Sequence, residues 1–366
     1  MNSTNLLYNI GVGLIDNVGD VLAKKLIAYC GSAEAVFRER KGKLLKIPDV
    51  GNAAATAIVS QNVLARAEEE IEFIERHKLN ALFYLDNDYP NRLKHCDDGP
   101  VMLYTKGNMD LNAKRIVSVV GTRNATEYGK RMCNEIVEGL AALEVLVVSG
   151  LAYGIDICAH KASIDNKIQT VAVVAHGHDR IYPGSHKSIV EQMYKNGGMV
   201  TEFISNTNPD RENFPKRNRI IAGLSDAVIV IESAKRGGAL ITADIGNSYN
   251  RDVFAVPGML GSKYSEGCNW LIKVNKGALL ESVKDLEYIM GWEPRDSKKK
   301  AVQKKIFVEL APSEKVLIEI IRRGSIGIDT LSLESKMATS IVSALLLNLE
   351  FAGVVKCMPG KVYQMN

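Results

Sequence analysis

The sequence predicts an α/β protein with a central doubly wound parallel sheet, a helical domain before it and a winged-helix-like domain after it. At 366 residues the chain is longer than one ordinary domain. Its middle alternates β-branched apolar runs with amphipathic stretches, the pattern of parallel strands joined by helices. The regions on either side have helical periodicity. We therefore expect domains at residues 1–78, 79–291 and 312–366, with a basic linker at 292–311.

The composition is that of a globular protein able to bury a core, with 46% hydrophobic and 24% charged residues. No apolar run reaches the ~18–20 residues that span a bilayer. Met1–Asn5 carries no basic stretch of the kind that opens a secretory signal. The six cysteines lie far apart with no C-x-x-C pair, so we expect isolated reduced thiols rather than disulfides or a zinc site. The expected location is the cytoplasm, without a membrane partner.

Net charge gives little indication of a partner, because it is small and local. The chain carries +4 at pH 7, and residues 292–308, with six cations and two anions, account for all of it. Any nucleic-acid site in the body of the protein must then be a local pocket rather than a broad positive surface. The charged run itself is expected to be a solvated linker.

The first 78 residues contain an internal repeat. Ile15-Asp16-Asn17-Val18-Gly19 recurs as Ile47-Pro48-Asp49-Val50-Gly51, and each glycine is followed four residues later by alanine. The pattern is similar to the paired helix-hairpin-helix units of SAM-like domains, whose glycine turns expose N–H groups to DNA phosphates. We favour a purely structural module that keeps the glycine for its backbone freedom, since little basic charge flanks either turn.

From Leu79 onward the pattern becomes extended, first at Ala81–Leu85 and Val101–Tyr104. Strand-like runs then alternate with helical ones. They predict an extended Rossmann-like sheet, in which ligands bind beyond the carboxyl ends of the strands. The predicted parallel strands are Ile116–Val120, Val145–Val148, Thr170–Val174, Met199–Phe203, Ala227–Ile231 and Val253–Val256.

The last domain has the pattern of three helices and a β-hairpin, which is typical of a winged helix. Ser313 is expected to cap the first helix, with Glu314 in its first turn. Further helices are expected from Ile328 and Thr339, followed by a hairpin around Pro359-Gly360. The third helix has no Arg or Lys, although helices that read DNA normally carry such groups. We therefore favour a wing that contacts protein.

Three glycine turns follow predicted strands and lie where such a sheet binds ligands. Gly121-Thr122-Arg123 follows the first strand, Ser149-Gly150 the second, and Gly237-Gly238 a later one, just before a helix. Glycine lets a ligand approach the backbone, helix N-termini offer free N–H groups, and Arg123 can present parallel donors to a phosphate. A mononucleotide would occupy one or two of these turns, whereas a nucleic-acid strand crossing the edge would use them all.

The segment at residues 214–225 gathers groups that hold phosphate or stack on bases. They precede an apolar helical pattern, and Pro215 suits the first turn of that helix. Cations at a helix N-terminus oppose its macrodipole, and an anion such as a nucleic-acid backbone relieves the conflict. The alternative is that an arginine of this segment pairs internally with an acid such as Glu202 or Glu232. The four candidate contacts are Phe214, Lys216, Arg217 and Arg219.

Five motifs in series resemble the DNA-processing protein A (DprA/Smf) family. The resemblance runs from about Tyr89 to Ser282 and departs from the family pattern at Ala175-His176-Gly177-His178-Asp179, where Gly-x-Gly-x-Asp is usual. It implies single-stranded DNA binding, loading of the RecA recombinase during natural transformation, and a homodimer formed through the α/β domain. The motifs are Gly121-Thr122-Arg123, Tyr128-Gly129, Ser149–Asp156 with Ala159-His160, Gly237–Ala243 and Val253–Gly258.

Other chemistries fit the sequence less well. His176 and His178 supply two ligands where structural zinc needs four, so we expect surface-loop histidines and no metal. The sequence has no G-x-S-x-G elbow, no G-x-x-x-x-G-K-[ST] phosphate loop and no G-x-G-x-x-G after the first strand. The main alternative is a nucleoside-monophosphate phosphoribohydrolase. However, the Gly237–Ala243 segment lacks the glutamate of P-G-G-x-G-T-x-x-E, and Asp244 is the nearest acid.

We therefore expect a non-catalytic protein without a cofactor, whose central domain binds single-stranded DNA. Phe214 would stack on a base, a contact worth about 1–3 kcal/mol, and the cations would hold phosphates. The residues expected to contact DNA are Gly121, Thr122, Arg123, Ser149, Gly150, Phe214, Lys216, Arg217, Arg219, Gly237 and Gly238.

Overall fold

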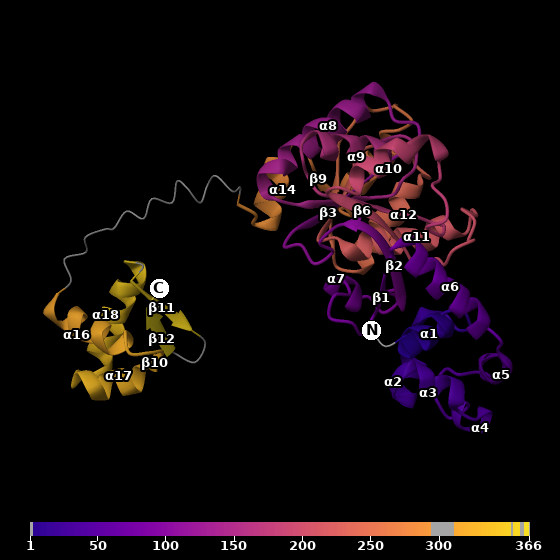
Figure 1. Cartoon of the computed structure of the whole chain (residues 1–366). Coiled ribbons are helices and arrows are strands. Elements are labelled where there is room, and N and C mark those ends of the chain that lie inside the picture. The colour runs from indigo at the N-terminus through magenta and orange to yellow at the C-terminus, as the bar shows by residue number, and fades with distance from the viewer. Residues whose placement is uncertain (1–2, 294–310, 353, 359–361, 366) are drawn as a thin grey trace. The chain divides into compact units, whose positions relative to one another are not determined.

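The computed structural model describes residues 3–293, 311–352, 354–358 and 362–365. The predicted basic linker at 292–311 lies almost wholly outside these ranges. The chain divides into two compact units, residues 1–296 and 297–366 (Figure 1). Among the described residues, no helix combines the length and the apolar character needed to cross a membrane.

A nine-stranded sheet with the order β1-β2-β6-β5-β4-β3-β7-β8-β9 forms the centre of the first unit. β2 pairs antiparallel with β1 and β6, and every pairing from β6 to β9 is parallel. This confirms the predicted α/β class. The strands are β1 (Asn80–Phe83), β2 (Met102–Asn108), β3 (Ile116–Val120), β4 (Leu146–Ser149), β5 (Thr170–Val173), β6 (Gly197–Thr201), β7 (Ala227–Val230), β8 (Asp252–Ala255) and β9 (Ala278–Leu279).

Strand β6 begins two residues earlier than the sequence pattern predicts. Its first residues, Gly197 and Gly198, are of a type that is usually disfavoured in strands. Here the neighbouring strand comes very close, because a Cβ on Gly197 would lie only 1.9 Å from the Thr170 carbonyl oxygen. The close approach of the β5 backbone therefore explains why glycines occur here. Because glycine is unusual in strands, the sequence pattern did not predict the start of β6.

Helices cover both faces of the sheet (Figure 1). Apolar residues of α8, α9 and α14 pack on one face, and those of α7, α11, α12 and α13 pack on the other. The Thr126 hydroxyl caps α8 by accepting from Gly129 N at 3.1 Å. The helices are α7 (Asn91–Lys94), α8 (Glu127–Leu140), α9 (Ile155–Asp165), α10 (Lys187–Met193), α11 (Asn213–Leu224), α12 (Gly238–Ser248), α13 (Glu266–Lys273) and α14 (Val283–Met290).

The N-terminal helices α1–α6 belong to the same compact unit and share a core with β1 and β2. Gly19 and Gly51 precede α2 and α5, with φ of −80° and −78°. A Cβ on either would meet no atom within 4 Å, and the positive φ angles fall on Asn17 and Asp49. The expectation that these glycines are kept for backbone freedom is therefore wrong. The helices are α1 (Ser3–Val12), α2 (Asp20–Cys30), α3 (Ala33–Arg38), α4 (Lys41–Leu44), α5 (Asn52–Ser60) and α6 (Leu64–His77).

The described residues of the second unit form a winged helix, as predicted, with three helices and a small sheet of order β10-β12-β11. Its first helix begins at Pro312, so Ser313 lies within the first turn and is not the cap. Proline suits this position because its missing N–H would have no partner there, and Glu314 accepts from Ala311 N at 2.9 Å. The predicted turn at Pro359-Gly360 lies outside the described residues. The elements are α16 (Pro312–Ile321), β10 (Ile326–Gly327), α17 (Ile328–Ser335), α18 (Thr339–Phe351), β11 (Val355–Met358) and β12 (Val362–Met365).

Candidate nucleic-acid interface

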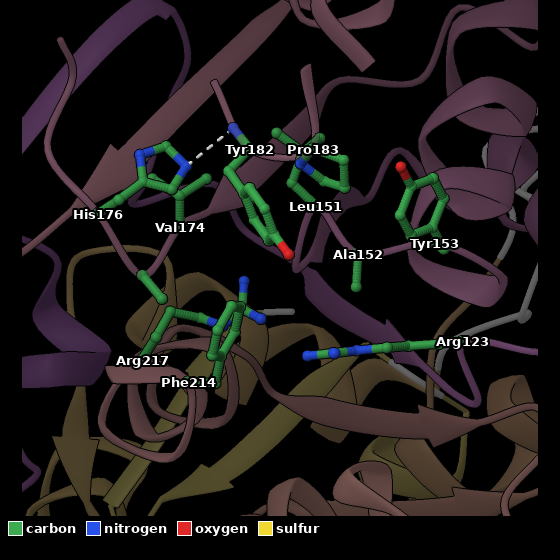
Figure 2. Close-up of a pocket in the computed structure, with 11 residues that line it drawn as sticks. Arg123, Leu151, Ala152, Tyr153, Val174, His176, Tyr182, Pro183, Phe214 and Arg217 are labelled. Atoms are coloured by element: carbon green, nitrogen blue, oxygen red, sulfur yellow. Dashed lines mark hydrogen bonds between the residues drawn. The ribbon is translucent and has the colours of Figure 1, made fainter. Parts of the chain in front are cut away.

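The carboxyl ends of the parallel strands border a cleft of about 750 Å³, here called the strand-end cleft. Seven of the eleven predicted contact residues line it. It continues into a smaller hollow beside Phe214 and Tyr182 (Figure 2). The predicted residues in the cleft are Gly121, Thr122, Arg123, Phe214, Arg217, Gly237 and Gly238.

Two arginines face one aromatic ring in this cleft (Figure 2). The guanidinium carbons of Arg123 and Arg217 lie 5.1 and 5.9 Å from the centroid of the Phe214 ring. The ring of Tyr182 lies 6.4 Å from that of Phe214, centroid to centroid. An aromatic ring flanked by cations suits a nucleobase with phosphates on either side.

Helix α11 presents Phe214 and Arg217 together. The helix begins at Asn213, so Pro215 lies in its first turn, as predicted. Residues three apart lie on the same side of a helix, and Phe214 and Arg217 accordingly share the cleft. On an adjacent part of the lining, Gly237 directly precedes α12 with no side-chain cap.

Arg217 lies beneath the cleft surface close to a buried acid, Asp156, and donates to the Val173 carbonyl. Arg217 and Asp156 are 5% and 7% exposed, and the charge of Arg217 opposes the burial that raises the pKa of Asp156 to about 6. The Ala152 N–H also donates to Asp156 at 3.4 Å. Gly150 makes room for this pair, since a Cβ there would lie 2.3 Å from Asp156 Oδ2 and 2.7 Å from Arg217 Nη1. Gly150 thus shapes the site from below rather than lining it.

Ser149 does not offer its hydroxyl to the cleft. The residue is the buried last position of β4, with 0% exposure. Its hydroxyl donates to the Val119 carbonyl at 2.6 Å. The predicted hydroxyl contact to a phosphate is therefore wrong, because this group already satisfies the neighbouring strand.

Lys216 and Arg219 face a second cavity of about 410 Å³, lined mainly by the turn between α1 and α2, by β2 and by the chain after β6. Arg219 donates to Asp20 at 3.0 Å and also to Glu202. The predicted internal pairing of an arginine with Glu202 is therefore confirmed, and Arg219 is not a cleft residue. Arg219 follows Arg217 by two positions, which corresponds to a rotation of roughly 200° around the helix. The two side chains therefore lie on different sides of α11.

Glu232, the other acid expected to pair with an arginine of α11, bonds to a different part of the protein. It accepts from the Thr126 N–H at 2.9 Å and from the Thr126 hydroxyl at 2.6 Å. Its carbonyl also accepts from Thr122 N at 2.8 Å. Glu232 therefore holds the turn that carries Arg123, and the pairing with α11 expected for it is not seen.

The histidines after β5 are not surface-loop residues. His176 is 1% exposed. Its Nδ1 donates to Gly177 O at 2.8 Å and its Nε2 accepts from Tyr182 N at 3.3 Å, so it positions Tyr182 in the hollow. His178 is half-buried, and burial lowers its pKa to about 4. Among the described residues, no group of three or more His, Cys, Asp or Glu side chains is placed to hold a metal ion.

The acid considered for a phosphoribohydrolase does not lie in the cleft. Asp244 points outward on α12 with a half-exposed side chain and pairs with Lys276 at 2.8 Å. The acid that does line the cleft is Asp156. It is buried close to Arg217 and accepts from the Ala152 N–H at 3.4 Å, so it helps to hold the loop after β4.

Several residues that line the cleft or its adjoining hollow were not predicted from the sequence. Arg211 lies just before α11, so helical spacing does not indicate its position in the cleft. Asp156 was part of a quoted motif without a role of its own. No sequence signal assigned Tyr182, because its position depends on the buried His176.

Comparison with known proteins assigns the chain to a family over most of its length. The model of the family described as "DNA recombination-mediator protein A" matches residues 80–290, and that of the "DprA winged helix domain" matches residues 308–361. A putative DNA processing protein DprA from Mycobacterium tuberculosis is 32% identical over 356 residues, covering 92% of this chain and 88% of the relative. The DprA of Bacillus subtilis is 40% identical over 202 residues, covering 55% of this chain and 68% of the relative.

Solved structures agree with this assignment. DNA processing protein A from Streptococcus pneumoniae aligns with a TM-score of 0.65 and 32% identity, covering 78% of this chain and 97% of the other. The same protein from Helicobacter pylori, whose structure is described for its single-stranded DNA binding mode, aligns with a TM-score of 0.54 and 25% identity. That alignment covers 59% of this chain and 98% of the other. The chain belongs to the DprA/Smf family of DNA-processing proteins.

Proposed function

We propose that this protein binds single-stranded DNA in the strand-end cleft. The observation that carries the proposal is the placement of Phe214 between Arg123 and Arg217, 5.1 and 5.9 Å from the two guanidinium carbons. A base stacked on Phe214 would have its neighbouring phosphates within reach of these cations. The turns at Gly121 and Gly237 add backbone N–H groups along the same cleft. A duplex keeps its bases stacked and paired, so it cannot use the aromatic ring.

Fluorescence anisotropy with single-stranded, duplex and mononucleotide ligands tests this proposal. We expect affinity for a single-stranded oligonucleotide to exceed that for the duplex of the same sequence and that for the mononucleotide. The first difference reflects access to the bases, and the second reflects the use of several turns at once. Equal affinity for duplex and single strand would contradict the proposal and would direct attention to the helical and winged-helix parts.

We also propose that the bound strand is delivered to the RecA recombinase during natural transformation, in the cytoplasm. Membership of the family of DNA recombination-mediator proteins supports this role. The winged helix supports a protein contact, because Ile341 and Leu347 of α18 are each 52% exposed and the helix carries no Arg or Lys. Strand exchange by RecA on DNA coated with single-strand-binding protein is the test. No acceleration by the full chain would contradict this role.

A homodimer through the α/β unit is part of the same proposal. β9 is an edge strand of the sheet, and unpaired edges are natural sites of association. Apolar side chains stand exposed beside it, with Trp270 at 37%, Val274 at 41% and Leu279 at 42%. Sedimentation equilibrium is expected to give a dimer that Leu279→Glu weakens. A monomeric wild-type chain at micromolar concentration would contradict it.

The proposed function requires no catalysis. The acid in the cleft, Asp156, is buried close to Arg217, and Asp244 lies outside the cleft, paired with Lys276. We therefore expect no release of free base from nucleoside 5′-monophosphates. Steady turnover that Asp156→Asn abolishes would instead support the phosphoribohydrolase alternative.

A further inference from the structure

Two thiols meet where α8 packs against α9. Cys133 of α8 is fully buried, and Cys158 of α9 is half-buried. Each sulfur lies against the backbone of the opposite helix. Cys133 Sγ lies 4.0 Å from Ile155 O, and Cys158 Sγ lies 3.7 Å from Lys130 O. These two cysteines are free thiols, as expected, and they lie on facing helices.

These two contacts are reciprocal, and together they locate both sulfur atoms. Ile155 precedes Cys158 by three residues, and Lys130 precedes Cys133 by three residues. Each sulfur thus lies about one helical turn before the opposite cysteine. Side chains on a helix tilt toward its N-terminus, over the preceding turn. Both sulfurs consequently project into the same space between the helices.

The surroundings give the two thiols different reactivity. The neighbouring Cys133 thiol, together with the charges of Lys130 and Lys161, lowers the pKa of Cys158 despite partial burial. The neighbouring Cys158 thiol and burial raise the pKa of Cys133. Because the thiolate is the reactive form, Cys158 is the group that attacks first. An accessible thiolate beside a second cysteine is the usual arrangement of a redox-sensitive thiol.

We propose that Cys133 and Cys158 are a modification site at which hydrogen peroxide forms a reversible disulfide. The Cys158 thiolate attacks one peroxide oxygen and breaks the O–O bond, which leaves a sulfenic acid and releases hydroxide. Cys133 Sγ then attacks Cys158 Sγ, and the sulfenic oxygen leaves as hydroxide, which takes up the Cys133 proton to give water. Two thiols lose two electrons in all, and one peroxide is reduced to two molecules of water. Dithiothreitol reverses the change by thiol–disulfide exchange.

The disulfide would tie together the two helices that begin at the cleft. α8 follows the turn that carries Arg123, and α9 follows the turn that contains Gly150. The two turns are already in contact, since Ile155 N donates to Thr122 O at 3.1 Å and a Cβ on Gly154 would lie 2.2 Å from the same oxygen. A disulfide between Cys133 and Cys158, one turn of α9 beyond Ile155, would restrict the unfolded chain. It would therefore raise the stability of the part of the protein that contains α8 and α9.

Mass spectrometry of the full chain after brief exposure to hydrogen peroxide tests the proposal. Wild type is expected to lose the mass of two hydrogen atoms, to yield a peptide linking Cys133 with Cys158, and to melt at a higher temperature until dithiothreitol is added. Cys133→Ser is expected to accumulate a sulfenic acid on Cys158, which dimedone traps. Cys158→Ser, at a half-buried position that leaves the core intact, is expected to show neither product. Cys30→Ser, which removes a half-buried thiol from α2, is the matched control and is expected to behave as wild type.

Two outcomes would overturn the proposal. One is a wild-type protein in which peroxide oxidises Cys158 without forming the linked peptide, because Cys133 then fails to resolve the sulfenic acid. The other is faster trapping of a sulfenic acid on Cys30 or Cys357 than on Cys158. Cys158→Ser replaces a half-buried residue, so it can be compared with wild type even if the core variant Cys133→Ser folds poorly. Both outcomes would then remain measurable.

Discussion

Single residues in the cleft divide into those that meet a ligand and those that hold the site together. Arg123 is exposed on a turn after β3, and Arg217 is 5% exposed over the buried Asp156. Both face Phe214, yet their removal has different consequences. An exposed cation can be deleted without disturbing the fold, whereas deleting a buried one leaves its counter-charge without a partner.

Replacing Arg123 with alanine is expected to weaken single-stranded DNA binding about tenfold, the value of one charge-assisted hydrogen bond. The melting temperature should not change, because the side chain is exposed. Anisotropy titration and thermal melting of the same preparations measure both quantities. Arg131→Ala removes an exposed arginine from α8 and serves as the control. Equal affinities for the two variants would remove Arg123 from the binding site.

Replacing Arg217 with alanine is expected to lower the free energy of unfolding by about 3–5 kcal/mol, because Asp156 would remain buried without its partner. Adding Asp156→Asn should restore part of the loss, since the neutral amide needs no counter-charge. Urea unfolding of wild type, both single variants and the double variant gives the coupling energy. Additive effects of the two substitutions would show that the residues do not interact.

Asp156 is also expected to make DNA binding depend on pH. Burial raises its pKa to about 6, so the carboxylate is charged at pH 7.5 and largely protonated at pH 5.5. Protonation removes a negative charge from the floor of the cleft, and affinity for a polyanion should therefore rise as pH falls through this range. Asp156→Asn should bind with little change over the same range. An affinity that falls toward pH 5.5 in wild type would contradict this assignment.

At the scale of elements, α11 shows what the sequence could and could not predict. Its start, its proline and its buried aliphatic residues follow from local pattern and were predicted correctly. The distribution of its cations was not, because Lys216, Arg217 and Arg219 point to different sides of a helix that turns ~100° per residue. The partner that selects the side for Arg219 is Asp20, 199 positions away in sequence, and no local pattern carries that information.

The glycine turns could be predicted from the local sequence, whereas the burial of the histidines could not. Turns after strands could be predicted, because parallel strands end at one edge of a sheet. The burial of His176 could not, because its environment is made by the chain around Tyr182 and Gly177. The contact between Cys133 and Cys158 likewise depends on the packing of two helices rather than on spacing in the sequence.

Helix α11 also anchors the N-terminal helices to the sheet, and Arg219 is the residue that does so. Arg219→Ala removes its bonds to Asp20 of α2 and Glu202 after β6, which should lower stability by about 3–5 kcal/mol and speed proteolytic removal of the helical part. Lys216→Ala, at the exposed neighbouring position, is the control and should change stability by less than about 0.5 kcal/mol. A loss of DNA affinity as large as that of Arg123→Ala, with stability unchanged, would instead make Arg219 a DNA contact.

At the scale of the whole molecule, the charges outside residues 292–308 sum to zero. The cleft therefore acts through a few placed cations rather than through a field of the entire protein. Family membership, the parallel sheet and the winged helix describe the framework, while the chemistry of binding depends on a small number of side chains at its edge.

The salt dependence of DNA binding tells whether the cleft or the basic segment at 292–308 provides most of the electrostatic attraction. Three cations line the cleft, Arg123, Arg211 and Arg217, and a single strand releases ~0.7 counterions per neutralised phosphate. The logarithm of the binding constant should therefore fall with the logarithm of salt concentration with a slope of about −2. Replacing Lys298, Lys299 and Lys300 with glutamine should leave that slope unchanged, and Arg123→Ala should make it shallower by about 0.7. A much steeper slope in wild type that the three glutamines reduce would show that the basic segment, and not the cleft, holds most of the phosphates.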